Sequence, residues 1–555
     1  MRRPHGTKVT ETLTWGGLDE TRGKPEQPIQ RCMAERPGVS RGHSTAKGDD
    51  PCRGCTSGTG RAEQRESHER EESRTVRGEQ KTGKPGWPAE DSLEGEKKQG
   101  ARSTEIRKTA NGDSANGREP GRSLLEAILD TGNMFDAQER VTANRGSAGI
   151  DGMTVEELND YLIKHYRELC ESIRGGWYKP KPVKRVEIPK PDGGKRQLGV
   201  PTVIDRMVQQ AMVQVLQPIF EQTFSDSSYG FRPKRNAHQA IQRAKRYYEE
   251  GYTYVVDLDL EKYFDTVNHD LLIKMVRETV KDEAVIALIR KFLKSGVMAD
   301  GLISQTEQGT PQGGNLSPLL SNIYLTKFDK MLEERGHKFV RYADDCNIYV
   351  KSPRAAERVM AGCIKFLEGK LKLKVNRKKS TTGSPTELKF LGFSLFRLKE
   401  GIGIRVHEKP LKRLKERLKA MTSRKRNGRI ERILQEITRL MNGWLGYYRL
   451  ADTQIQTYLR GISKWLRRRL RQLYWKRWKR VRTRYENLIR LGVSRNEAWQ
   501  WANTRKGYWC IAGSHIMTTT MNNRYFETLG FPDLRKRYEE LRERTRRLEI
   551  LHGTC

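Results

Sequence analysis

Apolar residues recur along the chain at two different spacings, and the spacing predicts the type of each element. Residues 205–220 place Met207, Ala211, Val215 and Ile219 on one face, which is typical of a helix packed in a core. The same helical spacing predicts four further helices, over residues 319–332, 355–373, 411–421 and 430–441. An apolar helix is also expected to start after Ser123, which is a favourable N-cap residue.

Two stretches rich in β-formers carry acids where strands rarely have them. Residues 252–260 predict a strand with Asp257 and Asp259 on one face, because side chains two residues apart leave a strand in the same direction. Residues 339–350 predict two strands joined by a tight turn, with Asp344 and Asp345 at its tip. Taken alone, this second stretch is equally well explained as an ordinary hairpin with an acidic tip.

Carboxylates that meet on neighbouring strands are costly unless a cation lies between them. Asp259, Asp344 and Asp345 offer the hard oxygen ligands that Mg²⁺ prefers. Two Mg²⁺ ions so held can activate a 3′-hydroxyl and stabilise a leaving pyrophosphate. The alternative is a buried carboxylate group paired with Arg or Lys. The three residues together predict a catalytic site with two Mg²⁺ ions.

Composition points to nucleic acid. The chain has 555 residues and a formal net charge of +37, which favours an RNA or DNA partner over the alternative of an anionic membrane surface. No run of 18 apolar residues predicts a membrane span. Scattered cysteines and the lack of a secretory signal favour the cytoplasm, and the lone pair Cys52 and Cys55 is not expected to bind zinc. Residues 1–120 have few aliphatic side chains and are expected to be disordered.

The acidic motifs carry a family resemblance. Tyr342-Ala-Asp344-Asp345, preceded by Asp259-Leu-Glu-Lys-Tyr-Phe264-Asp, resembles the palm of reverse transcriptases, and the chain from about residue 124 onward resembles the group II intron reverse transcriptase/maturase family. The resemblance implies an α+β right-hand polymerase, in which an antiparallel sheet in the fingers and palm is flanked by helices and is followed by an α-helical thumb or maturase domain. After the disordered basic leader at 1–120, the boundaries it implies are an N-terminal extension with the start of the fingers at 121–180, fingers and palm at 181–397, a thumb or maturase domain at 398–490 and a DNA-binding segment at 491–555.

The resemblance also implies roles for single residues. Asp259, Asp344 and Asp345, with the backbone carbonyl of Leu260, would bind the metals. A predicted β-hairpin over residues 183–201 would be the fingers, although it could equally be a solvated basic hairpin. The residues that would meet the deoxynucleoside triphosphate (dNTP) are Lys190, Arg196, Phe264, Gln312 and Lys379.

Two of these residues have plainer readings beside the implied ones. Phe264 would exclude a 2′-hydroxyl, or would simply be a core residue of the helix that follows the strand. Lys379 could act as a general acid toward pyrophosphate, although most lysines in such a basic run are only solvated. Residues 390–393 resemble the primer grip, read as a short strand where Gly392 admits the primer backbone. Residues 224–235 mix aromatics and cations without an assignable role.

Residues 462–484 predict one long basic helix. Trp475 and Trp478 are expected among its cations, and the glycines of residues 443–448 are expected to interrupt the helices before it. A basic helix face suits phosphate tracking along RNA or DNA, with a membrane-surface helix as the alternative. The expected nucleic-acid contacts are Arg467, Arg468, Arg471, Lys476, Arg477, Lys479 and Arg480.

The resemblance implies an RNA-directed DNA polymerase of a group II intron that binds the intron RNA to assist splicing and copies it at a DNA target. Its partners would be intron RNA, an RNA template with a DNA primer, target DNA and dNTPs. The C-terminal residues lack paired Cys spacing, so no HNH endonuclease domain is expected, as in the IIC class. The alternatives are an RNA-binding maturase with an inactive polymerase, and a reverse transcriptase of a defence or mutagenesis cassette.

Overall fold

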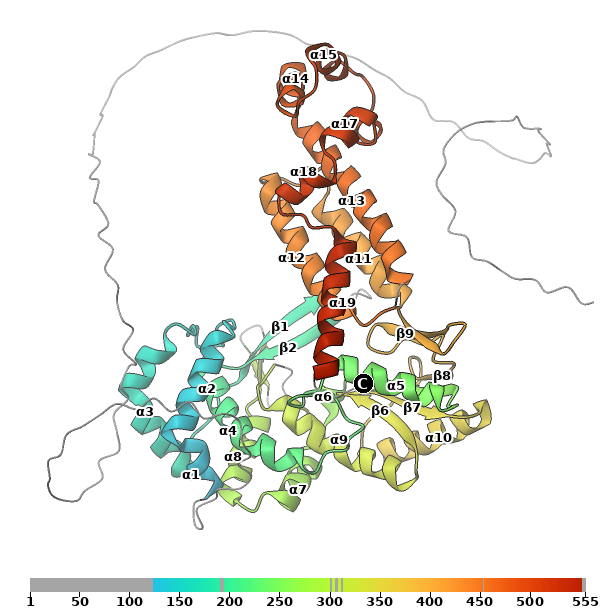
Figure 1. Ribbon diagram of the computed structural model, residues 1–555. Helices are drawn as coiled ribbons and strands as arrows, with labels where there is room; N and C mark the ends of the chain where they lie inside the picture. Colours follow the sequence, from blue (N-terminus) through green and yellow to red (C-terminus); the bar gives the residue numbers. More distant parts are fainter. Residues whose placement is uncertain are drawn as a thin grey trace, which may run out of the picture. The chain divides into compact units, whose positions relative to one another are not determined.

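The computed structural model describes residues 123–189, 194–299, 302–304, 308–310, 313–452 and 454–551 (Figure 1). Lys190, Gln312, Cys52, Cys55 and the leader at 1–120 therefore lie outside the described residues. Within the described part of the chain, no helix is both long enough and apolar enough to cross a membrane.

The first described helices pack on one long helix of the hydrophobic core. Ser123 caps the first of them, because its Oγ accepts a hydrogen bond from the Glu126 amide at 3.2 Å. Of the apolar face predicted over residues 205–220, Met207 and Ala211 lie in the core, whereas Val215 and Ile219 are only partly buried. Helices α1 and α2 contact α4, and α2 also contacts α3. The bounds are α1 (Leu124–Leu129), α2 (Thr131–Ala143), α3 (Leu158–Arg174) and α4 (Val203–Glu221).

The hairpin predicted over residues 183–201 is confirmed as β1 (Val183–Pro189) and β2 (Lys195–Val200), which pair antiparallel. It belongs to a four-stranded sheet in the order β2-β1-β4-β5. The remaining strands are β4 (Val297–Ala299) and β5 (Leu302–Ser304).

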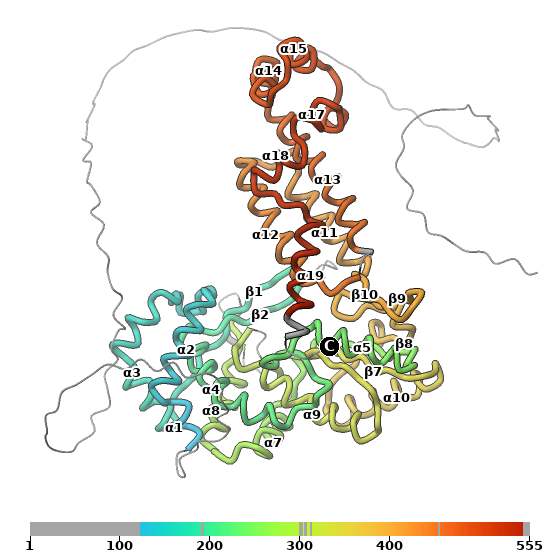
Figure 2. The backbone as a smooth tube through the Cα atoms, viewed as in Figure 1, coloured from blue at the N-terminus to red at the C-terminus, as the bar shows by residue number. Residues whose placement is uncertain are grey.

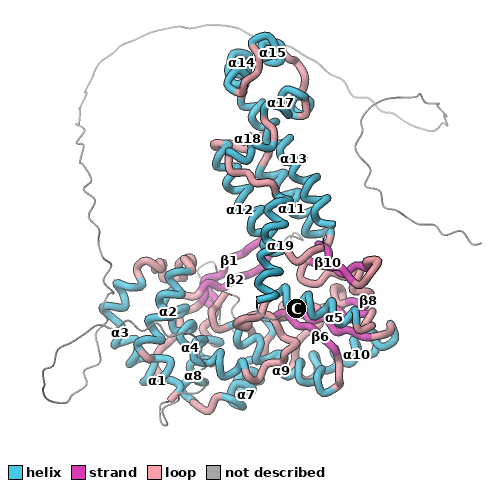
Figure 3. Tube along the Cα trace, viewed as in Figure 1, coloured by secondary structure: helices cyan, strands magenta, loops and turns pink. Residues whose placement is uncertain are grey.

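A second four-stranded sheet, in the order β6-β7-β3-β8, holds both acidic stretches. Helices α9 and α10 contact one face of it and α5 the other, as Figure 3 shows. Alternation along the strands explains this, because Val256 and Ile348 face one core while Val255 and Tyr349 face the second. The bounds are β3 (Tyr254–Leu258), β6 (Lys338–Tyr342), β7 (Asp345–Val350), β8 (Thr381–Gly383), α5 (Ala237–Glu249), α9 (Ser317–Glu334) and α10 (Pro353–Gly369).

Shorter elements complete this half of the described chain. Strands β9 and β10 form an antiparallel hairpin of their own, and α7 contacts both α8 and α9. The bounds are α6 (Tyr263–Thr266), α7 (His269–Thr279), α8 (Glu283–Leu293), β9 (Phe393–Arg397) and β10 (Ile402–Val406).

From residue 408 onward the described chain is helical, and α19 lies along α12 and α13 (Figure 2). Both predicted helices of this region form. The bounds are α11 (Glu408–Met421), α12 (Ile430–Tyr448), α13 (Gln454–Arg477), α14 (Val481–Arg490), α15 (Arg495–Ala502), α16 (Tyr508–Ala512), α17 (His515–Thr520), α18 (Asn523–Thr528) and α19 (Leu534–Leu551).

Two helix predictions were wrong here. The glycines of residues 443–448 do not interrupt α12, because its buried stripe continues through Met441 and Leu445 and outweighs about 1 kcal/mol per helical glycine. The basic stretch is not one helix, since α13 ends at Arg477 and α14 begins at Val481. Trp475 and Trp478 are buried at this bend instead of lying among exposed cations. The Trp478 carbonyl accepts a hydrogen bond from Arg484 Nε at 2.9 Å, which satisfies one carbonyl at the helix end.

Candidate active site

The sheet with the order β6-β7-β3-β8, which we call the palm sheet, brings the two acidic stretches together at one edge. Strands β3 and β7 pair antiparallel, with Leu258 opposite Cys346. The same register, extended by one residue, sets Asp259 opposite Asp345. Side chains of directly opposed residues lie about 4.5–5.5 Å apart at Cβ. The edge therefore gathers Asp259 and Asp345, with Asp344 in the adjoining turn.

The turn between β6 and β7 has two residues, because Tyr342 pairs with Asp345. Ala343, the first of them, has φ 58°, a left-handed conformation that costs a non-glycine residue about 1–2 kcal/mol. Such a conformation persists only where the surroundings hold it.

A buried ion pair holds this turn. The Arg341 guanidinium donates to both carboxylate oxygens of Asp329, at 2.7 and 2.5 Å, and both side chains are almost fully buried. Its Nη1 donates to the Ala343 carbonyl at 2.9 Å and to Asn322 Oδ1 at 3.1 Å. The strained residue is thus tied to the core through a guanidinium whose three nitrogens all donate hydrogen bonds.

The stretch 224–235, to which the sequence assigned no role, supports the same turn. Main-chain hydrogen bonds join it to β6, from the Arg341 amide to the Ser227 carbonyl at 2.9 Å and from the Tyr229 amide to the Arg341 carbonyl at 2.8 Å. A Cβ on Gly230 would lie 2.2 Å from the Ala343 nitrogen. Only glycine fits there, so this position shapes the acidic tip.

Asp259 is held through its main chain by the segment 374–380. Its amide donates to Ser380 Oγ at 3.1 Å, and its carbonyl accepts from the Asn376 amide at 2.9 Å. On its side chain, Lys379 Nζ lies 3.9 Å from Oδ2. The Glu261 amide also donates to the Lys374 carbonyl. These two main-chain hydrogen bonds between the segments leave out the carbonyl of Leu260, which was predicted to bind metal.

The carboxylates raise one another's pKa. Burial and then the charge of Asp344 raise the pKa of Asp345 to about 6. Burial raises the pKa of Asp344, and the charge of Asp259 adds to the effect. Burial and then the charge of Asp345 raise the pKa of Asp257 to about 7. Asp257, which shares a strand face with Asp259, is therefore a fourth acid coupled to the group.

Cations oppose this repulsion without cancelling it. The charge of Lys389 lowers the pKa of both Asp257 and Asp345, and that of Arg196 lowers the pKa of Asp344. Arg196 is an exposed residue of β2. Arg196 therefore lies within electrostatic range of the acidic tip.

This set of acids fits a divalent cation. Among the described residues, no three His, Cys, Asp or Glu side chains form a closed metal-binding cluster. Mg²⁺ does not require one, because it usually binds one or two carboxylates and completes its shell with water and substrate phosphates. Several partly buried acids that raise one another's pKa are an open donor set for such an ion.

Phe264 lies at the margin of the core. Its side chain is half-buried against the core in α6, and its ring centroid lies 5.2 Å from that of Tyr263. Tyr263 is the fully packed aromatic, whose hydroxyl donates to the Ser321 carbonyl at 2.9 Å. Phe264 is therefore packed from one side and open to solvent on the other.

His269, which the sequence reasoning missed, joins α7 to the loop at residues 308–310. Its Nε2 donates to the Gly309 carbonyl at 2.6 Å, since a carbonyl can only accept. The Gly309 and Thr310 amides donate to the Val267 and Phe264 carbonyls, at 2.8 and 2.6 Å. This loop is consequently fixed beside Phe264.

The predicted primer grip is a turn leading into β9, so the prediction of a short strand was wrong. Gly392 has φ 86°, and a Cβ there would lie 2.6 Å from the hydroxyl oxygen of Tyr448. The glycine makes room for a helix residue of this chain.

The predicted nucleic-acid cations of α13 have different surroundings. The Arg468 guanidinium lies 4.2 Å from the Trp509 ring centroid and donates to the Trp509 carbonyl at 3.1 Å. Lys476 Nζ donates to the Arg424 carbonyl at 2.6 Å. Burial lowers the pKa of Arg471 to about 10. Of the remaining predicted contacts, Arg467 and Arg477 are half-buried, and Lys479 and Arg480 are exposed.

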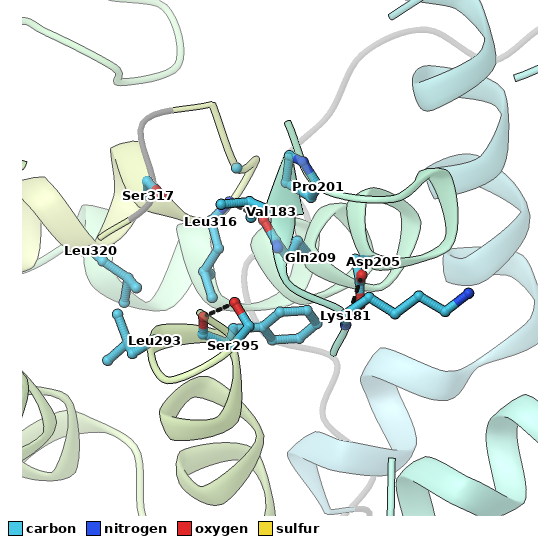
Figure 4. A pocket seen from close by; sticks show the side chains of 12 residues that line it. Lys181, Val183, Pro201, Asp205, Gln209, Leu293, Ser295, Leu316, Ser317 and Leu320 are labelled. Carbon is cyan, nitrogen blue, oxygen red and sulfur yellow. Dashed lines mark hydrogen bonds between the residues drawn. The ribbon is translucent and has the colours of Figure 1, made fainter. Parts of the chain in front are cut away.

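A small cavity at the base of the fingers hairpin is not the nucleotide site. Figure 4 shows Lys181, Asp205, Gln209 and Leu316 among its lining residues, and its volume is about 10 Å³, room for one water molecule. The Lys181 amide donates to Asp205 Oδ2 at 3.2 Å. None of the three predicted catalytic acids lines it.

Comparison with known proteins agrees with this geometry. Residues 188–395 match the family described as reverse transcriptase (RNA-dependent DNA polymerase), and residues 411–492 match the group II intron maturase-specific domain. Protein YkfC of Escherichia coli is 35% identical over 321 residues, which cover 50% of this chain and 84% of that protein.

Two relatives named for introns also match. The group II intron-encoded protein LtrA of Lactococcus lactis is 36% identical over 219 residues, 39% of this chain and 36% of that protein. A putative COX1/OXI3 intron 1 protein of Saccharomyces cerevisiae is 32% identical over 223 residues, 40% of this chain and 26% of that protein. The chain thus spans only about a quarter to a third of these two relatives. The chain belongs to the group II intron-encoded reverse transcriptases, RNA-directed DNA polymerases that carry a maturase domain.

Proposed function

We propose that Asp259, Asp344 and Asp345 bind two Mg²⁺ ions and that this site adds dNTPs to a primer paired with an RNA template. The observation that carries the proposal is the register of β3 and β7, which sets Asp259 opposite Asp345 beside the turn residue Asp344. Burial, together with the charges of neighbouring acids, raises the pKa of Asp344 and of Asp345, which supports the proposal because a bound divalent cation would stabilise their charged forms.

Two bound Mg²⁺ ions would lower the pKa of the primer 3′-hydroxyl and stabilise the charge on the leaving pyrophosphate. The protein's part is to hold the acids in place through Arg341, Gly230 and Ser380, as described above. Lys379 lies beside Asp259 and donates a proton to pyrophosphate in this proposal. Arg196 offers a bidentate fork for the triphosphate.

Phe264 is the proposed sugar-discriminating residue. Its half-buried ring is backed by Tyr263, and its carbonyl is bonded to the Thr310 amide. A ring held from behind in this way would meet a 2′-hydroxyl as a steric obstacle. Lys190 and Gln312, which lie outside the described residues, remain predictions for the same pocket.

The helical part of the chain is proposed to bind the parent intron RNA and assist its splicing, after which the polymerase copies the RNA at a DNA target. The net charge of +37 supports a nucleic-acid partner. Lys479 and Arg480 are the proposed phosphate contacts, because both are exposed where α13 ends. With such partners, the protein is proposed to act in the cytoplasm, at the nucleoid.

Primer extension tests the polymerase. The purified protein is given an RNA template, an annealed DNA primer, dNTPs and Mg²⁺, and product length is measured for wild type, Asp344→Ala and Asp270→Ala. Asp270, on α7, is the matched control: it is an exposed acid whose carboxylate lies 3.1 Å from the guanidinium of Arg290 on α8. We expect wild type and the control to extend the primer and Asp344→Ala to fail. If wild type extends no more than Asp344→Ala while still promoting splicing of its intron, the polymerase proposal is wrong.

A further inference from the structure

The loop at residues 308–310 is bonded through its main chain to the segment that carries Phe264. The Gly309 amide donates to the Val267 carbonyl at 2.8 Å, and the Thr310 amide donates to the Phe264 carbonyl at 2.6 Å. Both bonds join main-chain atoms, so they depend on where the loop lies and not on its side chains. A shift of the loop would therefore be passed to the backbone of Phe264.

Gly309 allows the loop to come this close. Its φ is 94°, and a Cβ on it would lie 2.9 Å from the Phe264 carbonyl oxygen and 3.0 Å from Asp265 Cα. A side chain at this position would collide with the backbone of α6, and glycine alone adopts the conformation without strain. The loop thus lies directly against the peptide that joins Phe264 to Asp265.

His269 holds Gly309 from the other side. Its Nε2 donates to the Gly309 carbonyl at 2.6 Å. The side chain is 5% exposed, and its Nδ1 atom is buried without a hydrogen-bond partner among the described residues. The bond to Gly309 is therefore the polar contact that orients this ring. Since the Gly309 amide is bonded as well, both polar main-chain groups of the glycine are held.

Phe264 needs support from outside its own helix, because α6 is only one turn long. The helix has four residues, and its N-cap residue Lys262 has a left-handed φ of 49° and makes no capping hydrogen bond with its side chain in the described part of the chain. So short a helix is stable only through tertiary contacts. Tyr263 supplies one of them as a buried core residue. The loop at 308–310 supplies the other, on the main chain of Phe264 itself.

We propose that His269 is a positioning residue for sugar selection. By holding Gly309 against α6, it sets how closely the Phe264 ring approaches the sugar of the incoming nucleotide, and so how strongly deoxynucleotides are preferred over ribonucleotides. The inference rests on the proposed function, in which Phe264 excludes a 2′-hydroxyl, and it deepens that function by naming a second residue that determines specificity. Active-site geometry is sensitive enough for this, since a misplacement of about 1 Å can change a rate about a hundredfold.

A purely structural role for His269 would have different consequences. Its replacement would then lower the unfolding midpoint and slow the incorporation of dNTPs and ribonucleoside triphosphates (rNTPs) to the same extent. A positioning role changes the ratio of the two kcat/KM values, because only one of the two substrates carries the hydroxyl that meets the Phe264 ring. This ratio is the sugar preference that the experiment measures.

The experiment uses the full chain with an RNA template, a DNA primer and Mg²⁺, and measures kcat/KM for single additions of a dNTP and of the matching rNTP. His269→Phe keeps a ring and removes the donor, whereas His269→Gln offers an amide donor in its place. The matched control is His238→Phe on α5, because His238 Nε2 is bonded to the Tyr447 carbonyl, also at 2.6 Å. The thermal unfolding midpoint is measured alongside.

His269→Phe should lower the sugar preference about two- to tenfold, the effect of one net hydrogen bond. His269→Gln should recover part of the loss, and His238→Phe should keep the wild-type preference. Gly309→Ala should lower the preference as well, because the added methyl group forces the loop away from α6. This variant tests the same contact if His269→Phe does not fold.

A double variant shows whether His269 acts through Phe264. Phe264→Ala alone should lower the sugar preference more than His269→Phe does. In the Phe264→Ala background, His269→Phe should leave the preference unchanged, because two substitutions that act through one contact are not additive. A further fall in that background would show that His269 acts by another route and would contradict the inference.

The outcomes separate this inference from the polymerase proposal. If wild type extends primers while His269→Phe and Gly309→Ala keep its sugar preference, the inference is overturned and the polymerase proposal stands. An equal fall in His238→Phe also overturns the inference. If wild type incorporates no dNTP, the polymerase proposal is wrong and the inference falls with it.

Discussion

The palm tip (Asp257, Asp259, Asp344 and Asp345) and helix α13 are both rich in charged side chains, but these side chains have opposite roles in the fold. At the palm tip the acids are coupled to one another and are positioned by other groups, namely the Arg341 guanidinium, Gly230 and the Ser380 hydroxyl. On α13 several cations do the holding themselves, as Arg468 does on Trp509 and Lys476 on the Arg424 carbonyl. Charge is available for function where the fold does not depend on it.

The largest expected effect separates the two regions by activity. Asp345→Asn should lower kcat for primer extension about a thousandfold or more, because transition-state stabilisation by a bound metal is worth several kcal/mol. It should not lower stability, since it removes a repelling charge. Arg468→Gln should do the reverse, with a lower unfolding midpoint and near wild-type kcat. Extension assays and thermal unfolding of both variants check this, and a stable, inactive Arg468→Gln would contradict the contrast.

Loss of the buried guanidinium at the palm tip is expected to be the largest stability effect. Arg341→Met leaves Asp329 charged and buried, which typically costs about 3–5 kcal/mol. Urea unfolding measures the change, with Arg290→Met as control, because that ion pair is exposed. The double variant Arg341→Met/Asp329→Leu should recover much of the loss. Equal destabilisation by the single and double variants would show that the buried charge is not the cause.

Two glycine substitutions sharpen the comparison at smaller magnitude. Gly230→Ala should cost about 1–3 kcal/mol and reduce primer extension, because the added Cβ meets the Ala343 nitrogen at 2.2 Å. Gly461→Ala, on α13 with nothing within 4 Å of the new Cβ, should be neutral or stabilise by up to about 1 kcal/mol. Denaturant midpoints give both values. A harmless Gly230→Ala would remove the argument that this residue shapes the turn.

The pH dependence of stability should report the coupled acids. Asp257 and Asp345 have folded pKa values of about 7 and 6, above the 3.8 of an ordinary Asp. Between those limits the folded state binds more protons than the unfolded state, so these groups stabilise the metal-free protein at low pH and lose that effect as pH rises through 6 to 7.

Thermal unfolding without metal should therefore show this part of the stability falling from pH 5 to pH 8. Asp257→Asn should flatten the fall, and excess Mg²⁺ should offset it at the higher pH, where the carboxylates are ionised. A midpoint that is equally pH-dependent in wild type and Asp257→Asn would show that this acid does not titrate as expected.

The smallest expected effect concerns RNA affinity. Lys479→Gln/Arg480→Gln should reduce the slope of log K against log salt for intron RNA by up to about 1.8, with each lost phosphate contact contributing about 0.7–0.9. Extension of an unrelated primed template should be almost unaffected. Arg468→Gln is the matched control, and its salt slope should equal that of wild type. Equal slopes in all three proteins would place the RNA elsewhere.

The sequence predicted the parts of this molecule that have a local signature. Stretches rich in β-formers at 339–350 and 252–260 predicted β6, β7 and β3, and helical spacing predicted α4, α9 and α11. The acids at the ends of β3 and β7 were predictable as a group, because strand pairing brings such residues together.

Residues that act through main-chain contacts between distant segments were not predictable. Gly230, Ser380 and His269 each meet a backbone atom of another segment, and no spacing pattern marks them in advance. The end of α13 depends on where Trp475 and Trp478 are buried, which composition alone does not reveal. The same holds for Arg468, whose acceptor is a distant carbonyl.

Iron-directed cleavage tests most directly whether Asp259 and the turn at Asp344 and Asp345 share a metal. Fe²⁺ takes the place of Mg²⁺, and ascorbate with peroxide then cuts the backbone beside the bound ion. Cuts are expected in two places, near Asp259 and near Asp345, and excess Mg²⁺ or Asp259→Asn should suppress both. If Asp259→Asn suppresses only the cut at its own position, the two acidic stretches do not bind a common ion and the account of the active site is wrong.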